Sequence, residues 1–198
     1  MTLIDFIRHG EPEGGRLYRG AAIDDPLSEK GWRQMWQAVG ESRAWDQLVS
    51  SPLQRCHAFA LALGKKHGLP VSVEQDFREV GFGSWEGRSP VDIQQQAPGE
   101  YAAFYADPVN NRPPGAEDLL DFGRRVAGAM ERTASTHAGK RVLVVAHAGV
   151  IRATLGHVLQ APPAAWYRVK VDNAGFSRFA RDERGWQLIC HNLPGIPP

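Results

Sequence analysis

Residues 2–11, which read TLIDFIRHGE, decide the fold of this chain. The side chains of Leu3, Ile4, Phe6 and Ile7 form a short apolar run, which predicts a buried strand. Arg8 and His9 follow at its carboxyl end, where open α/β sheets bind their ligands. Gly10 then lets the backbone turn sharply and approach a ligand closely. A guanidinium beside an imidazole is poorly suited to a hydrophobic core but well suited to binding an anion. This strand end is therefore a candidate anion site.

The composition indicates one globular domain, residues 1–198, because 42% of the residues are hydrophobic and 23% are charged. A net charge of +1 gives no bulk attraction to nucleic acid or to a membrane surface, so we expect neither as a partner. No apolar run approaches the roughly 20 residues that span a bilayer. Asp5 interrupts the first apolar segment, which argues against a signal peptide. We therefore expect a cytoplasmic protein, and the sequence leaves its oligomeric state open.

The two cysteines, Cys56 and Cys190, lie far apart and lack the spacing of metal ligands. We interpret them as reduced thiols, as in most cytoplasmic proteins. We accordingly expect no metal site and no cofactor.

Strands and helices are predicted to alternate along the chain. Further strands are expected at residues 47–51, 71–73, 141–146, 168–171, 176–180 and 186–190, and helices at 28–42, 52–67, 116–137 and 148–159. The last two strands are predicted to form a hairpin. This alternation predicts an α/β fold, a three-layer α/β/α sandwich whose sheet is mostly parallel.

Residues 88–116 interrupt the alternation, and we interpret them as a small lid within the single domain. They are expected to hold one or two short helices that bear Tyr101, Phe104 and Tyr105. These rings have two interpretations: they pack the lid onto the core, or they offer an apolar surface to an aromatic base.

Further candidate site residues occur at three later points of the chain. Arg55 lies in the first turn of a predicted helix, where the helix dipole disfavours a cation unless an anion binds nearby. Glu79 lies in a glycine-rich stretch, residues 77–87, which suggests a tightly folded loop. His147 follows the clearest buried strand and precedes a helix, which repeats the pattern around His9. The N–H groups at such a helix start can also hold an anion.

Taken in order, these segments resemble the histidine phosphatase superfamily, also called the phosphoglycerate mutase-like family. The matching motifs are RHG at residues 8–10, SPLQR at 51–55, RE at 78–79 with EG at 86–87, and AHAG at 146–149. The resemblance covers essentially the whole chain and implies a phosphoglycerate mutase-like fold. It implies that His9 is the nucleophile and Glu79 the general acid. It further implies that Arg8, Arg55 and His147 bind the phosphate group.

The chemistry of these residue types fits phosphoryl transfer. Two guanidiniums and a second imidazole can neutralise phosphate oxygens without Mg²⁺, and arginine forks match those oxygens in geometry. A neutral imidazole nitrogen of His9 can attack phosphorus and form a phosphohistidine. Glu79 can protonate the leaving alkoxide and then act as a base toward water. We therefore expect a small-molecule phosphomonoester as the substrate.

Three interpretations of the function stand. A phosphatase passes the phosphohistidine to water, whereas a phosphoglycerate mutase-type isomerase passes it back to a bound sugar acid. Residues 88–116 contain Arg88 and Arg112 but three acids, which makes a poor clamp for a second phosphate and favours hydrolysis. An inactive phospho-ligand-binding module is the interpretation from a different class, and the intact set of five site residues argues against it.

The layout is similar to the alpha-ribazole phosphatase branch, which removes the 5′-phosphate of a nucleotide-like intermediate in cobalamin biosynthesis. The Tyr18-Arg19-Gly20 loop and the PGAE stretch at residues 114–117 support this likeness. One departure follows Arg55, where relatives commonly continue with alanine and a Gln-Thr-Ala segment. This chain reads CHAFA there, and we expect the change to affect packing only.

Four further polar residues are assigned from their positions. Glu86 is interpreted as holding its loop rather than performing chemistry. Glu117 is explained by compensation of a helix dipole, with contact to the substrate as the alternative. Tyr18 and Arg19 lie in the first loop, where contact with the substrate and support of the loop are equally expected.

Overall fold

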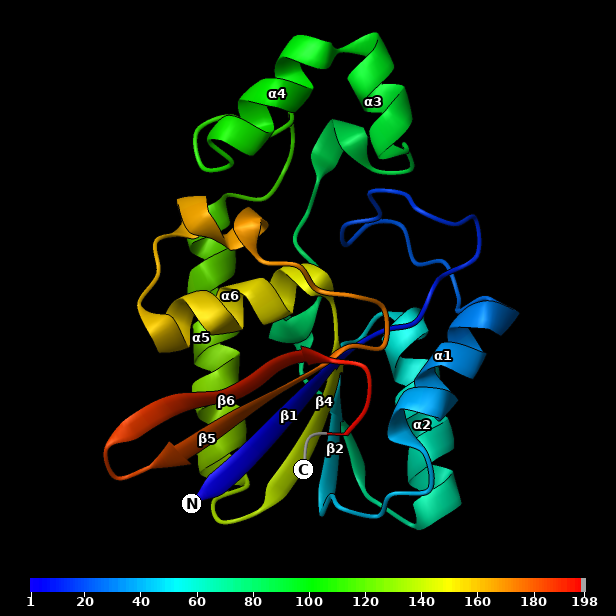
Figure 1. Ribbon diagram of the computed structural model, residues 1–198, viewed down its shortest axis with the longest axis vertical. Helices are drawn as coiled ribbons and strands as arrows, with labels where there is room; N and C mark the ends of the chain where they lie inside the picture. The colour runs from blue at the N-terminus through cyan, green and yellow to red at the C-terminus, as the bar shows by residue number, and fades with distance from the viewer. Residues whose placement is uncertain (197–198) are drawn as a thin grey trace.

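One six-stranded mixed sheet forms the centre of the computed structural model, which describes residues 1–196 (Figure 1). From edge to edge its strands run in the order β3-β2-β4-β1-β5-β6. The strands are β1 (Thr2–Arg8), β2 (Gln47–Ser50), β3 (Val71–Val73), β4 (Arg141–Ala146), β5 (Phe176–Asp182) and β6 (Gly185–Leu193). Strands β1 to β4 pair in parallel, whereas β5 pairs antiparallel with β1 and β6 antiparallel with β5. The mostly parallel sheet and its closing hairpin are therefore confirmed.

Helices cover both faces of this sheet and give the predicted three layers (Figure 1). The helices are α1 (Glu29–Val39), α2 (Gln54–His67), α3 (Pro90–Gln96), α4 (Pro98–Ala106), α5 (Leu119–Thr136) and α6 (Ala148–Leu159), with 3₁₀ turns η1 (Gln75–Phe77), η2 (Gly83–Trp85) and η3 (Pro163–Arg168). Helices α1 and α2 pack on one face, and α5 and α6 pack on the other. None of the helices within residues 1–196 combines the length and hydrophobicity needed to cross a bilayer.

Strand β4 is covered on both faces. Its side chains alternate, so that Val142 and Val144 belong to the hydrophobic cluster beneath α5 and α6. Leu143 and Val145 belong to the cluster beneath α1 and α2. All four are fully buried, and burial of one such side chain stabilises a fold by about 1.5–3 kcal/mol. This central strand is therefore a rigid support for the residues that follow its carboxyl end.

The strand predicted for residues 168–171 is wrong. The turn η3 occupies its beginning, and the residues after the turn form no strand. Their carbonyl groups accept hydrogen bonds from arginine side chains instead. Arg152 donates from Nε to the oxygen of Val169 at 2.9 Å. Arg8 donates from Nη1 to the oxygen of Val171 at 2.6 Å. Side chains from distant segments satisfy this backbone, so the local pattern alone could not reveal its conformation.

Residues 88–116, the lid segment, carry α3 and α4 away from the sheet (Figure 1). Phe104 of α4 is fully buried, and its ring centroid lies 5.0 Å from that of Trp85. Tyr105, by contrast, is 43% exposed and lines the cavity described below. The two interpretations of the lid aromatics thus fall on different residues, because Phe104 packs the segment onto the core and Tyr105 faces the cavity.

Candidate active site

A cavity of about 500 Å³ opens where β1 and β4 end and where α6 begins. Four of the five predicted site residues line it, namely Arg8, His9, Arg55 and Glu79. The rest of the wall comes from the first loop, from Val80 and Phe82 beside Glu79, from the lid segment, from the start of α6, and from the end of η3 and the stretch after it. Residues predicted from three separate motifs therefore meet at one place.

His9 follows β1 directly, and its geometry fixes which ring nitrogen is available. Its Nδ1 lies 2.7 Å from the carbonyl oxygen of Gly10. A carbonyl oxygen can only accept a hydrogen bond, so Nδ1 carries the proton and Nε2 keeps its lone pair. Burial, together with the positive charges of Arg55 and Arg8, holds the pKa of His9 well below its ordinary value. The imidazole is therefore neutral at neutral pH, with an unprotonated Nε2.

The structure explains the glycine at position 10 by packing against α1, not by the expected approach to a ligand. A Cβ atom at this position would lie 2.2 Å from the carbonyl oxygen of Gly31 in α1. The RHG motif therefore needs glycine because the backbone of α1 packs closely against it. The predicted close approach to a ligand is not what the geometry requires.

Arg8, which is half-buried, and Arg55, which is buried, present cations that main-chain oxygens hold in place. Arg55 is 1% exposed, and it donates to the carbonyl oxygens of Gly20 and Ile23, each at 2.9 Å. Burial lowers the pKa of Arg8 to about 10, so it stays protonated at neutral pH. Among the described residues, the Nε atoms of both arginines are buried and lack a hydrogen-bond partner. Two guanidiniums, one half-buried and one buried, each with an unused Nε donor, match the oxygens of a phosphate group.

Glu79 lies in the loop after η1 and is 9% exposed. Its Oε1 accepts a hydrogen bond from the N–H of Val80 at 3.0 Å. Its Oε2 accepts one from the N–H of Gly149, in the first turn of α6, at 3.3 Å. A Cβ atom on Gly149 would lie 2.2 Å from Oε1 of Glu79, so only glycine leaves room for this carboxyl group. The carboxyl group is thus fixed between two main-chain donors at the cavity wall.

His147 lies behind His9 and is not part of the cavity wall. It is fully buried, and the centroids of the two imidazole rings are 5.2 Å apart. Its Nε2 shares a 2.7 Å hydrogen bond with Oγ of Ser51. Burial and the charge of Arg55 lower the pKa of His147 well below its ordinary value. The structure therefore brings His147 next to His9, and its contact with phosphate stays a prediction.

Cys56, the departure after Arg55, packs against His147. Its Sγ lies 3.6 Å from Nε2 of that ring and 3.4 Å from the carbonyl oxygen of Ala146. Burial raises the pKa of the Cys56 thiol, so it stays protonated and unreactive. The departure from relatives thus falls on a packed position beside the site.

Tyr18 and Arg19 of the first loop, for which substrate contact and loop support were equally expected, differ in the structure. Tyr18 lines the cavity, and its hydroxyl lies 2.7 Å from that of Tyr105. Arg19 also borders the cavity, but its Nε pairs with Asp25 at 2.8 Å and its Nη1 donates to the oxygen of Gly15 at 2.8 Å. Tyr18 therefore faces the cavity, whereas the polar atoms of Arg19 support the loop.

Glu86 holds its loop, as interpreted. Its two carboxylate oxygens accept hydrogen bonds from the N–H groups of Phe82 at 2.8 Å and Ala22 at 3.1 Å.

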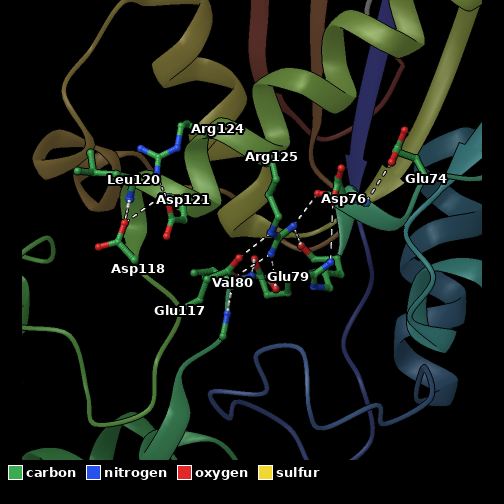
Figure 2. A network of polar contacts seen from close by, with 12 residues as sticks. Glu74, Asp76, Glu79, Val80, Glu117, Asp118, Leu120, Asp121, Arg124 and Arg125 are labelled. Carbon is green, nitrogen blue, oxygen red and sulfur yellow. Dashed lines mark hydrogen bonds and ion pairs between the residues drawn. The ribbon is translucent and has the colours of Figure 1, made fainter.

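The dipole explanation of Glu117 is wrong. Asp118 is the residue that caps α5, accepting from the N–H groups of Leu120 and Asp121. Glu117 precedes the helix and instead binds Arg125 (Figure 2).

Several cavity residues were missed by sequence reasoning. Arg152 lies one turn after Gly149 on α6, and this helical spacing is a signal that could have revealed it. Tyr167 belongs to η3, and Lys170 lies in the stretch after it that was mistaken for a strand. Neither segment gave such a signal. Within the described part of the chain, no group of three or more His, Cys, Asp or Glu residues is placed to hold a metal ion.

Comparison with known proteins identifies the family. The model of the histidine phosphatase superfamily, branch 1, matches residues 4–194, and the chain belongs to this superfamily. A bifunctional protein of Mycobacterium tuberculosis is 33% identical over 180 residues, which are 89% of this chain but 49% of that relative. The chain thus spans about half the length of the first curated relatives that it matches.

Two further similarities concern named phosphatases. An adenosylcobalamin/alpha-ribazole phosphatase of Salmonella typhimurium is 29% identical over 176 residues, which are 87% of each chain. The solved structure of a mycobacterial glucosyl-3-phosphoglycerate phosphatase with VO3 matches with a TM-score of 0.84 and 27% identity. That match covers 96% of this chain and 98% of the other.

Proposed function

We propose that this chain is a phosphomonoesterase that hydrolyses a small phosphorylated metabolite through a phosphohistidine intermediate. One observation carries the proposal. The neutral His9, with Nε2 unprotonated, lines the same cavity as Arg8 and Arg55, whose Nε donors are buried and unused. A phosphate dianion placed among these residues would meet a nucleophile and two compensating charges at once.

The reaction has two steps. In the first, Nε2 of His9 attacks phosphorus, the ester P–O bond breaks, and Glu79 in its protonated form gives its proton to the leaving oxygen. In the second, Glu79 takes a proton from water, the water oxygen attacks phosphorus, and the P–N bond breaks to release phosphate and restore His9. Arg8 and Arg55 neutralise the phosphoryl oxygens throughout, with His147 as a third proposed ligand. No metal ion takes part in the proposed mechanism.

Alpha-ribazole 5′-phosphate, an intermediate of cobalamin biosynthesis, is the substrate that we favour. Four aromatic side chains, Tyr18, Phe82, Tyr105 and Tyr167, line the cavity and offer an apolar wall to a planar base. The similarity to an alpha-ribazole phosphatase supports the same choice.

The arginines of the lid segment support hydrolysis over mutase-type isomerisation. Arg88 donates from Nη2 to the side chain of Gln96 at 2.8 Å. Arg112 donates from Nη2 to the carbonyl oxygen of Gly81 at 2.8 Å. Neither residue lines the cavity, so neither is placed to hold the second phosphate of a sugar bisphosphate.

A second substrate class is favoured by two other cations of the cavity wall, Arg16 and Arg152. Arg152 donates to the carbonyl oxygen of Val169, and its guanidinium lies 5.4 Å from the ring centroid of Tyr167. Neither contact neutralises its charge, so a phosphomonoester that also bears a carboxylate would find a partner there. Arg152→Gln should then lower kcat/KM about tenfold for phosphoserine but not for phosphoethanolamine, which lacks the carboxylate.

The test of the function is phosphate release in the presence of EDTA. The substrates are alpha-ribazole 5′-phosphate, 3-phosphoglycerate and p-nitrophenyl phosphate, each with the wild type and with His9→Ala. Strong preference for the first substrate, lost in the variant, would support the specific assignment. Slow release from all three would support a phosphatase of another substrate. No release, with conversion of 3- to 2-phosphoglycerate, would contradict hydrolysis and indicate a mutase. Phosphate binding without turnover of any substrate would indicate an inactive binding module.

A further inference from the structure

The backbone that carries Glu79 belongs to no regular element. Residues 78–82 lie between η1 and η2 and are part of neither a helix nor a strand. The polar groups of this backbone must be satisfied from elsewhere if the loop is to keep one conformation. Figure 2 shows that the side chains of Glu117 and Arg125 converge on this stretch.

Arg125, from the second turn of α5, makes three hydrogen bonds to main-chain oxygens around Glu79. Its Nη1 donates to the oxygen of Asp76 at 2.6 Å and to that of Arg78 at 2.9 Å. Its Nη2 donates to the oxygen of Glu79 itself at 3.1 Å. One planar guanidinium therefore binds the chain both before Glu79 and at Glu79.

Glu117 completes the arrangement from the other side. Its two carboxylate oxygens accept from Nε and Nη2 of Arg125 at 2.7 and 2.8 Å. Its Oε2 also accepts from the N–H of Gly81 at 3.1 Å, two residues beyond Glu79. Although burial acts to raise it, the pKa of Glu117 is lowered because Arg125 and the Gly81 N–H stabilise the carboxylate. The pair is thus charged on both sides at neutral pH.

Neither member of this pair lines the cavity, so neither is placed to touch a substrate. Position nevertheless matters greatly for a general acid, because a misplacement of about 1 Å can cost about a hundredfold in rate. We propose that Arg125 and Glu117 are positioning residues that hold the general acid Glu79 at the leaving group. This inference rests on the proposed function, in which Glu79 protonates the departing oxygen.

The test compares two esters of nearly the same shape, phenyl phosphate and p-nitrophenyl phosphate. The phenolate leaving group is strongly basic and needs a proton, whereas p-nitrophenolate leaves readily without one. The value of kcat/KM reports the steps up to the phosphohistidine, where Glu79 donates its proton. The variants are Arg125→Lys, which keeps the charge and loses the fork, and Glu117→Gln, which keeps the size and loses the charge.

Arg132→Gln is the matched control. Arg132 lies two turns further along α5 and binds the side chains of Glu74 and Asp76 at the surface, without contact to the backbone around Glu79. Urea unfolding of all three variants measures any general loss of stability. A purely structural role would lower the rates for both esters in the same proportion.

Both positioning variants should lose about tenfold or more in kcat/KM for phenyl phosphate and less than about threefold for p-nitrophenyl phosphate. Arg132→Gln should change neither by more than about twofold. Equal losses for the two esters, or the same selective loss in Arg132→Gln, would overturn the positioning role and leave the phosphatase intact. A wild type inactive on both esters would instead overturn the proposed function, and this inference with it.

Discussion

His9 and Glu79 reach the same cavity from two different kinds of backbone. His9 directly follows β1, which pairs with β4 on one side and β5 on the other. Glu79 lies in an irregular loop whose carbonyl oxygens bind Arg125 and whose Gly81 N–H binds Glu117. Main-chain hydrogen bonds of the sheet therefore hold the backbone next to His9, the proposed nucleophile, whereas two side chains hold the backbone of Glu79, the proposed general acid. The difference teaches that the acid half of the site is the half that single substitutions can displace.

Removal of the two proposed catalytic side chains, His9 and Glu79, should give the largest effects, and the two effects should differ in kind. His9→Ala is expected to abolish turnover of every ester, because the proposed covalent intermediate forms on this side chain. Glu79→Gln should lower kcat/KM for phenyl phosphate by about 10²–10³, with a much smaller loss for p-nitrophenyl phosphate. Steady-state kinetics on both esters measures this. Equal losses for the two esters in Glu79→Gln would remove Glu79 from the role of acid.

Gly149→Ala should displace the acid without removing it. The new Cβ would lie 2.2 Å from Oε1 of Glu79, so the carboxyl group must move. We expect a loss of about tenfold to a hundredfold in kcat/KM for phenyl phosphate. The free energy of unfolding should change by less than about 1 kcal/mol, since alanine favours a helix.

Gly128→Ala in α5 is the control for this substitution. A Cβ there would approach only Nη1 of Arg132, at 3.3 Å, so the activity should stay within about twofold of the wild type. Full activity of Gly149→Ala would show that the observed position of the carboxyl group is not the working one.

The smallest expected effect is the pH dependence of folding stability, which comes from the two histidines that follow β1 and β4. Burial, with the charge of Arg55, lowers the pKa of both His9 and His147 in the folded protein. Below about pH 6.5 the unfolded chain binds protons that the folded chain does not, so stability is lost as the pH falls. Each histidine should cost about 1 kcal/mol per pH unit in that range.

Urea unfolding at pH 7.5 and pH 5.5 measures this loss, for the wild type and for His9→Asn. Asparagine does not titrate, so the variant should lose less stability between the two values. A loss of the same size in both proteins would show that the imidazole of His9 is not buried in the neutral form.

The sheet and the ends of its strands were predictable because both are encoded locally. A hydrophobic run such as that of β4 specifies a buried strand, and the residue after it must then lie at the sheet's carboxyl edge. His9 and His147 follow such runs, and Arg8 is the last residue of β1. These side chains lie close together because β1 and β4, the strands that carry or precede them, pair in parallel.

The support of Glu79 was not predictable in this way. Glu117 and Arg125 are eight residues apart, and the carbonyl oxygen that Arg125 binds at Glu79 is 46 residues away from it in the sequence. No periodicity links such distant partners, and a charged residue at a helix start has an adequate local explanation. The same limit explains the false strand at residues 168–171, whose backbone Arg8 and Arg152 satisfy from other segments. Long-range contacts of side chains with backbone need the structure.

The most direct test of the central claim is to trap the covalent intermediate. The wild type and His9→Ala would be mixed with a phosphate ester labelled with ³²P, quenched in alkali within the first turnover, and digested for mass spectrometry. An alkali-stable, acid-labile phosphoryl group on the His9 peptide of the wild type, absent from the variant, is the predicted result. Turnover of the ester without label on His9, or with label on another residue such as His147, would contradict the proposed mechanism.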